Sequence, residues 1–251
     1  MAPTTRADRQ RAAANKANRR AAPMLPFGTQ HGGQHGGQRA GAGRKPKGDR
    51  AGVPHDTRSV LATRYPAHAT VKLRQHLPPL RRRCAYAALR AAFAAGCDRL
   101  GFRLIHYAVL NDHLHFVVEA NGRTALSRGM QGLLIRIART LNKLWQRRGA
   151  VFADRYHDRV LTSPREVRNV LVYVLGSVLA NGKKHAAEGR MVAVPQAIDV
   201  FTSAPWFDGF REPVTVRGLE AIPRTVTAAH TWLLTIGWRR HGLLSVHEVP
   251  V

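Results

Sequence analysis

NDHLHFVVEA, residues 111–120, carries two histidines, His113 and His115, separated by a single leucine. Its apolar residues predict a strand over 113–119, and side chains two apart in a strand point to the same face of a sheet. Both imidazoles are therefore expected to project together. Two convergent neutral imidazoles can hold a divalent cation and leave positions open for phosphate oxygens. The alternative is a pair of surface histidines that bind no metal.

The preceding stretch, FRLIHYAVL (102–110), is a second apolar run, and only Asn111 and Asp112 separate the two, which predicts a β-hairpin. Hydrophobic periodicity on either side predicts the other elements. In chain order they are a strand at 68–74, a helix at 80–99 ended by Gly101, the hairpin, a helix at 124–148, a strand at 156–161 and a helix from Pro164. This order predicts an α+β, ferredoxin-like split βαβ fold: an antiparallel sheet with helices on one face plus one extra helix.

The extra helix carries a tyrosine, Tyr173, toward the edge of its apolar side. Its start is marked by Ser163 as the capping residue, Pro164 at the first position and Glu166 at the third. A phenol has a reference pKa of about 10 and is a poor nucleophile at neutral pH, but a nearby metal and cationic side chains can stabilise the phenolate. Attack on a phosphodiester would then give a covalent phosphotyrosine. The alternative is a tyrosine that only packs its ring on the sheet.

The composition points to a polyanionic partner. The 251 residues include 40 Lys and Arg against 15 Asp and Glu, a formal net charge of +25, which makes nucleic acid the first candidate. Two cysteines exclude a secreted disulfide framework, and no run of about 18 apolar residues suits a membrane span. The basic N-terminus has no apolar signal region. We therefore expect a cytoplasmic protein without a membrane partner.

Three regions are expected from the changes in composition along the chain. Residues 1–64 predict a disordered basic arm, 65–186 the folded domain, and 187–251 a C-terminal appendage. Basic side chains on the second long helix and near the end of the domain are expected to contact DNA phosphates, the alternative being a merely solvated helix face. They are Arg136, Arg139, Lys143, Arg147, Lys183 and Lys184.

Three segments resemble one known family. NDHLHFVVEA (111–120), RYHDRVL (155–161) and REVRNVLVYVL (165–175) are similar to the single-tyrosine HUH transposases, especially the REP-associated tyrosine transposases and their insertion-sequence relatives. The similarity covers roughly residues 65–185. It implies a ferredoxin-like fold, Mg²⁺ or Mn²⁺ as cofactor, single-stranded, hairpin-forming DNA as substrate, and a homodimer. By position, His113 and His115 would be metal ligands, and Tyr173 would be the nucleophile that takes the 5′ phosphate.

The sequence departs from this family at one position. Four residues after the tyrosine the family carries Asn or Gln as a further metal ligand, and this chain has Ser177. Asn181 follows one helical turn later, in ANGKKH (180–185). Three interpretations stay open: Ser177 ligates weakly, the helix shifts to bring Asn181 in, or the metal site is impaired.

The function predicted from these residues is that of a DNA transposase, which cleaves and rejoins single-stranded DNA through a 5′-phosphotyrosine. Two alternatives remain: a catalytically impaired nucleic-acid-binding module of the same fold, and a metal-dependent phosphodiesterase that uses water. Tyr156 is a rival for the role of the nucleophile, and otherwise a packed strand residue.

Overall fold

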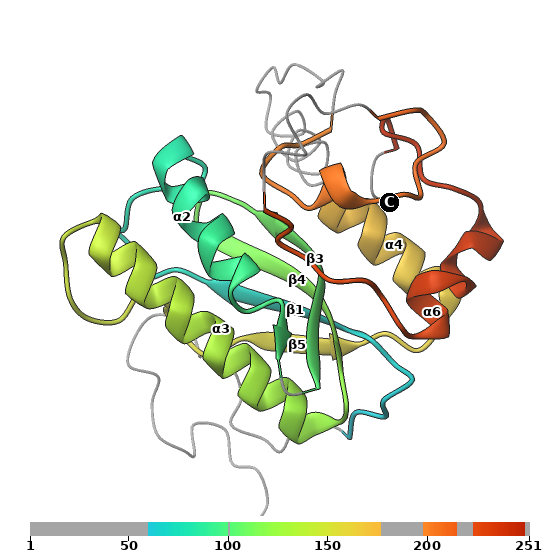
Figure 1. The fold of residues 1–251 in the computed structure, drawn as a ribbon, viewed down its shortest axis with the longest axis horizontal. Coiled ribbons are helices and arrows are strands. Elements are labelled where there is room, and N and C mark those ends of the chain that lie inside the picture. Colours follow the sequence, from blue (N-terminus) through green and yellow to red (C-terminus); the bar gives the residue numbers. More distant parts are fainter. Residues whose placement is uncertain (1–59, 100, 177–197, 215–222, 249–251) are drawn as a thin grey trace, which may run out of the picture. The chain divides into compact units, whose positions relative to one another are not determined.

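The computed structural model describes residues 60–99, 101–176, 198–214 and 223–248 (Figure 1). Most of the predicted N-terminal arm and the expected domain boundary near residue 186 lie outside these ranges, so the three predicted regions stay predictions. Among the helices of the described ranges, none has the length and apolar character of a membrane span.

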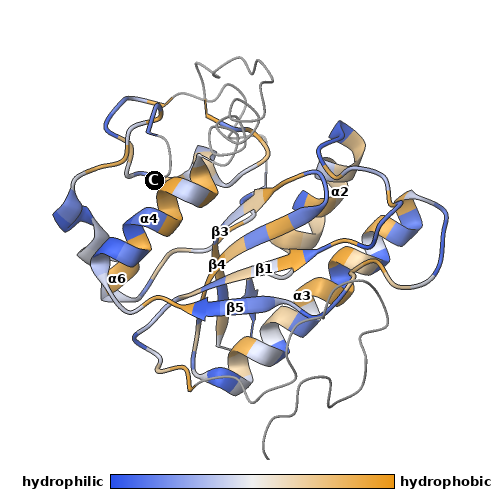
Figure 2. Ribbon diagram, turned by 180° about the vertical axis from the view of Figure 1, so that it is seen from behind, coloured by the Kyte–Doolittle hydropathy of each residue, from blue (hydrophilic) through white to orange (hydrophobic). Residues whose placement is uncertain are grey.

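The described residues form a five-stranded antiparallel sheet with the order β2-β3-β4-β1-β5. The strands are β1 (Ala67–Lys72), β2 (Asp98–Arg99), β3 (Phe102–Val109), β4 (His113–Ala120) and β5 (His157–Val160). Figure 2 shows β3 and β4 as largely hydrophobic and β5, at the sheet edge, as hydrophilic. The order β3-β4-β1-β5 is that of the ferredoxin-like split βαβ fold, which confirms the predicted class.

Helices cover both faces of this sheet (Figure 1). On one face, α2 (Arg83–Ala94) and α3 (Arg123–Leu144) bury apolar side chains against the strand residues that alternate inward. On the other face lies α4 (Pro164–Leu175), whose Leu171 and Val174 pack with Ala108 and Val117 of the sheet. The sequence thus predicted the extra helix at the correct place in the chain. In the structure this helix packs on the second face of the sheet, where it contributes to a separate hydrophobic core.

The helix predicted at 80–99 is shorter than expected. It ends at Ala94, and Asp98–Arg99 form β2 instead, paired with the start of β3. The turn between them contains Gly101 at φ +77°, a left-handed conformation that favours glycine. Pairing of this segment with the sheet edge satisfies its backbone groups, and this long-range gain overrides the local helical pattern.

The second long helix also ends early, at Leu144 rather than near residue 148. Gln146 has φ +50°, and the side-chain amide of Asn142 donates to the carbonyl of Gly149 while its oxygen accepts from Arg147. The asparagine therefore stabilises a loop in place of a further helical turn.

The capping pattern predicted for α4 is present in full. The Ser163 hydroxyl accepts a hydrogen bond from the Glu166 backbone N–H, and the Glu166 carboxylate accepts from the backbone N–H of Ser163. The backbone N–H of Thr162 also donates to this carboxylate, and together with Arg159 it lowers the Glu166 pKa to about 2. A charged carboxylate thus anchors the N-terminus of the helix that carries Tyr173 in its last turn.

Parts of the C-terminal region pack onto the α4 face of the sheet. Leu233, beside Leu234 in α6 (Trp232–Thr235), and Trp238, in the short 3₁₀ helix η3 (Gly237–His241), are buried in the core that contains Leu171. A second 3₁₀ turn, η1 (Ala204–Trp206), lies next to β3 because the Ser203 N–H donates to the Tyr107 carbonyl. This region therefore completes the second core.

The fully buried carboxylate of Glu119 fastens the same region to β4. It accepts hydrogen bonds from the backbone N–H groups of His230 and Thr231, and it pairs with Arg103 at 3.0 Å. A buried charge without such partners would be strongly unfavourable. Glu119 therefore links β4, β3 and the C-terminal region.

Alanine substitutions at two glycines of α3 are expected to change the stability of the protein in opposite directions. A Cβ on Gly129 would lie 2.1 Å from the Phe102 ring, whereas a Cβ on Gly132 would meet only the flexible end of Arg136, at 3.3 Å. Gly129→Ala is expected to lower the free energy of unfolding by about 1–3 kcal/mol through overpacking. Gly132→Ala is expected to raise it by about 0.5–1 kcal/mol, because alanine loses less backbone entropy in a helix. Urea denaturation of both variants checks this, and equal midpoints would contradict it.

Candidate active site

The pairing of β1 with β4 brings together a cluster of polar side chains on the face of the sheet that α4 covers. Thr70 lies directly opposite His115, and Lys72 lies opposite His113. His68 is two residues before Thr70 and so occupies the same face. The side chains of three histidines therefore come from two neighbouring strands and project to one side.

His115 is at the centre of this cluster. Its Nδ1 lies 3.1 Å from Nε2 of His68 and 3.0 Å from the Thr70 hydroxyl. Its Nε2 lies 3.3 Å from the hydroxyl of Tyr173, with the two ring centroids 5.0 Å apart and edge to face. The structure thus brings Tyr173 against the histidine pair singled out from the sequence.

His113 is held by its neighbour in the chain. Its Nδ1 lies 2.7 Å from a carboxylate oxygen of Asp112, and the other oxygen of that carboxylate lies 3.7 Å from the Lys72 ammonium group. A carboxylate only accepts hydrogen bonds, so Nδ1 of His113 carries a proton, and Nε2 is the ring nitrogen that can offer a lone pair to a cation. The ring centroid of His113 is 4.9 Å from that of His115.

Burial keeps the inner histidines neutral. Loss of solvent, aided by the nearby His68 and His113, lowers the pKa of His115 to about 3. Burial, with the positive charge of Arg159 and the nearby His157, lowers the pKa of His68 to about 4. Burial also raises the pKa of the Tyr173 phenol above its usual value. At neutral pH His68 and His115 are therefore neutral, and Tyr173 keeps its proton.

The donor set suits a divalent cation in part. Nε2 of His113 is available, and so is Nε2 of His115 when its Nδ1–H donates to Thr70. That Nε2 lone pair can accept from the Tyr173 hydroxyl or bind a cation, but it cannot do both at once. The described ranges contain no group of three or more His, Cys, Asp or Glu side chains suited to a metal ion. Ser177 and Asn181, the expected further ligands, lie outside the described residues, so their three interpretations stay open.

Three residues of this cluster escaped the sequence analysis. His68 and Thr70 were placed only within a predicted strand at 68–74, and Asp112 in the junction of the predicted hairpin. The alternation in 68–74 could have indicated that His68 and Thr70 share a face, but only the strand register places them against His115.

The rival tyrosine lies elsewhere. Tyr156 is buried in the core between the sheet and the helices α2 and α3, whereas Tyr173 packs against the core on the opposite face. The structure therefore separates Tyr156 from His113 and His115.

The basic residues expected to contact DNA also divide between regions. Helix α3 contains Arg136, Arg139 and Lys143, and Arg147 lies just after its end. This helix packs on the sheet face opposite α4. Arg147 is engaged locally, with Asn142 and the carbonyl of Ala150. Lys183 and Lys184 lie outside the described residues.

One family model and several solved structures are similar to this chain. Residues 62–174 match the family model described as "Transposase IS200 like". No curated protein matches the chain. Among solved structures, a REP-associated tyrosine transposase bound to a REP hairpin is similar over 71% of this chain and 93% of its own, with 15% identity and a TM-score of 0.46.

Two further solved structures are similar over shorter lengths. A Deinococcus radiodurans R1 protein named as a transposase shares 11% identity over 57% of this chain and 100% of its own, with a TM-score of 0.33. A bacterial tRNA(His) guanylyltransferase-like protein in complex with GTP shares 13% identity over 51% of this chain and 69% of its own, with a TM-score of 0.34. At these values the structural likenesses carry no functional argument. The family model spans the whole sheet and Tyr173, so over residues 62–174 this chain matches the IS200-like transposases.

Proposed function

We propose that this protein cleaves and rejoins single-stranded DNA through a 5′-phosphotyrosine on Tyr173. The observation that carries the proposal is the position of the Tyr173 hydroxyl, 3.3 Å from Nε2 of His115, in a group that also contains His113. A nucleophile beside two imidazoles has the composition needed for metal-assisted phosphoryl transfer. The match of residues 62–174 to a transposase family model supports DNA as the substrate.

His113 and His115 are the residues that would hold Mg²⁺ or Mn²⁺, each through Nε2. Such a cation would withdraw electron density from a phosphate oxygen and make the phosphorus more electrophilic. Asp112 orients the imidazole of His113. His68 and Thr70 contact Nδ1 of His115, the ring nitrogen that does not face Tyr173. These neighbours reduce the freedom of both rings, which supports a preorganised site.

Tyr173 would form a bond from its phenolic oxygen to the scissile phosphorus. The bond from phosphorus to the 3′ oxygen breaks, and the electron pair stays on that oxygen, which takes up a proton. The phenol proton passes to solvent. The products are a tyrosine ester of the 5′ phosphate and a free 3′ hydroxyl, and attack by a 3′ hydroxyl on that ester would rejoin a strand.

The charge balance supports the choice of partner. A formal net charge of +25 on 251 residues favours a polyanion, and phosphate contacts from basic side chains give binding that weakens with salt. We propose hairpin-forming single-stranded DNA as the substrate and a homodimer as the active assembly, in line with the family resemblance.

Replacing the proposed nucleophile tests the chemistry directly. With single-stranded hairpin DNA and Mn²⁺, the protein is expected to form an adduct that survives denaturation and carries the 3′ label, while the 5′-labelled fragment migrates free. Tyr173→Phe should abolish the adduct because it removes only the attacking oxygen, and His113→Ala should reduce it strongly. Tyr156→Phe is the matched control and should keep the adduct, since that ring lies in the other core. A denaturing gel separates these species.

Other results of this gel would overturn the proposal in distinct ways. Cleavage without any adduct, unaffected by Tyr173→Phe, would indicate a phosphodiesterase that uses water. Salt-dependent DNA binding with neither cleavage nor adduct would indicate a binding module that has lost its chemistry.

The role of Asp112 can be tested through metal binding alone. Asp112→Asn removes the carboxylate that orients His113 and is expected to weaken Mn²⁺ binding by about 10- to 100-fold. Titration of the full chain, followed by the electron paramagnetic resonance signal of free Mn²⁺, measures the affinity. Asp98→Asn, which removes an equal charge from β2, should leave the affinity unchanged. Equal affinities for the two variants would show that Asp112 does not orient a metal ligand.

A further inference from the structure

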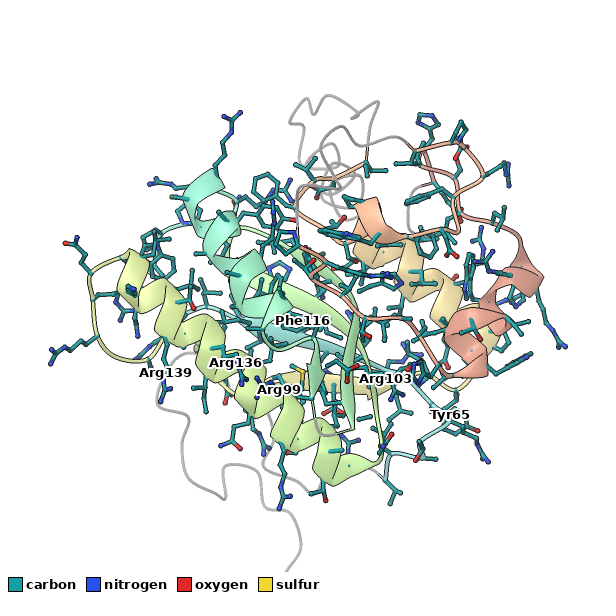
Figure 3. The ribbon with its side chains drawn as sticks, viewed as in Figure 1. Tyr65, Arg99, Arg103, Phe116, Arg136 and Arg139 are labelled. Carbon is teal, nitrogen blue, oxygen red and sulfur yellow. The ribbon has the colours of Figure 1, made fainter. Side chains whose placement is uncertain are left out.

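A hollow lined by arginines lies on the other face of the sheet, beside α3. It has a volume of about 530 Å³ and is lined from the turn after α2, from β2, from the loop after β4 and from α3. Three arginines contribute to its wall, Arg99, Arg128 and Arg136, together with Asn121 and Thr124. Figure 3 labels Arg99 and Arg136 near each other along α3. This arginine pocket is separated by the sheet from the side chains around Tyr173.

Glycines create the space in the pocket. Gly129 lets α3 approach Phe102 closely, since a Cβ there would lie 2.1 Å from the ring. Gly132 leaves the pocket open, because a Cβ there would meet only Nη1 of Arg136 within 4 Å. Any larger side chain at position 132 would occupy part of the hollow. The volume falls within the range of about 300–1,000 Å³ that is typical of sites for small ligands.

Within the part of the chain that the structure describes, the arginines of this pocket have no acidic partner. Arg99 and Arg128 form no ion pair or hydrogen bond with any described residue, and Arg136 donates only to the Gly132 carbonyl. The first turn of α3, which contributes Thr124 to the wall, contains no acidic residue. Three guanidinium groups around one hollow repel one another, and an anion placed among them would relieve that repulsion.

We propose that the arginine pocket binds a phosphate of the DNA backbone, at a part of the substrate away from the cleaved bond. The inference rests on DNA being the substrate, and it extends the proposed function to a second contact on the opposite face of the sheet. Guanidinium groups bind phosphate through paired N–H donors, and the hollow has room for the attached sugar. This contact supplies affinity and contributes nothing to the chemical step.

Binding measured over a range of salt concentrations tests the pocket. The probe is fluorescein-labelled single-stranded hairpin DNA, followed by anisotropy with the full chain. Arg99→Gln combined with Arg136→Gln is expected to weaken binding by about tenfold or more and to reduce the slope of log affinity against log salt by about 2. Arg82→Gln combined with Arg83→Gln removes the same charge at the other end of α2, and this control should keep the wild-type slope.

A neutral variant separates the pocket from a general effect of charge. Gly132→Met fills the hollow without changing the charge, and it is expected to weaken binding while Gly132→Ala weakens it less. Thermal melting shows whether each variant is folded.

The outcomes distinguish this inference from the proposed function. If the pocket variants bind as the Arg82 and Arg83 control does, while the wild type forms the adduct, only the pocket inference is wrong. If the pocket variants lose affinity and show a smaller slope of log affinity against log salt, while the wild type forms no adduct, the inference holds and the proposed chemistry is wrong. If the wild type does not bind DNA, both are wrong.

Discussion

β1 pairs with β4 in a register that sets Thr70 opposite His115 and Lys72 opposite His113. Successive side chains of a strand point to opposite faces, so a slip of one residue in β1 would move His68, Thr70 and Lys72 to the apolar core beneath α2 and α3. The residues between them, Ala69 and Val71, would then be exposed to the polar side. Burial of this apolar face therefore holds the histidine cluster in place.

The second face carries the cluster because α4 crosses it. The capping box at Ser163 and Glu166 starts this helix, and its apolar side, with Leu171 and Val174, packs on the sheet. Tyr173 lies between these residues in sequence and so projects at the margin of the packed side, where its hydroxyl meets Nε2 of His115. Partial burial raises the phenol pKa at this point, so the proposed attack depends on neighbouring groups to stabilise negative charge on oxygen.

The two faces of the sheet offer different chemistry to DNA. The face under α4 presents neutral imidazoles and a phenol, while the face under α3 presents arginines around a hollow. The sheet between them keeps the two sets of side chains apart. Under the two proposals made above, a DNA strand long enough to reach both would be bound at one site and cut at the other. Such an arrangement lets affinity change without altering the reacting groups.

Much of the fold was predictable from local patterns, because hairpins, caps and amphipathic helices depend on residues close together in the chain. The hairpin of β3 and β4, the capping box of α4 and the apolar side of α3 are examples. The segment 98–99 was predicted wrongly as helix, since its pairing with β3 is a contact that no helical period reveals.

The sequence alone determined the candidate chemistry: two histidines on one face of a strand, a tyrosine on a capped helix, and a large excess of positive charge. Tertiary structure decided which groups meet them. In the fold, His68 and Thr70 contact His115, and Tyr156 lies in the core on the opposite face of the sheet. Three arginines, Arg99, Arg128 and Arg136, line one hollow. The physical reason is that strand register and helix packing join residues far apart in the chain, and burial of apolar surface over the whole domain sets both.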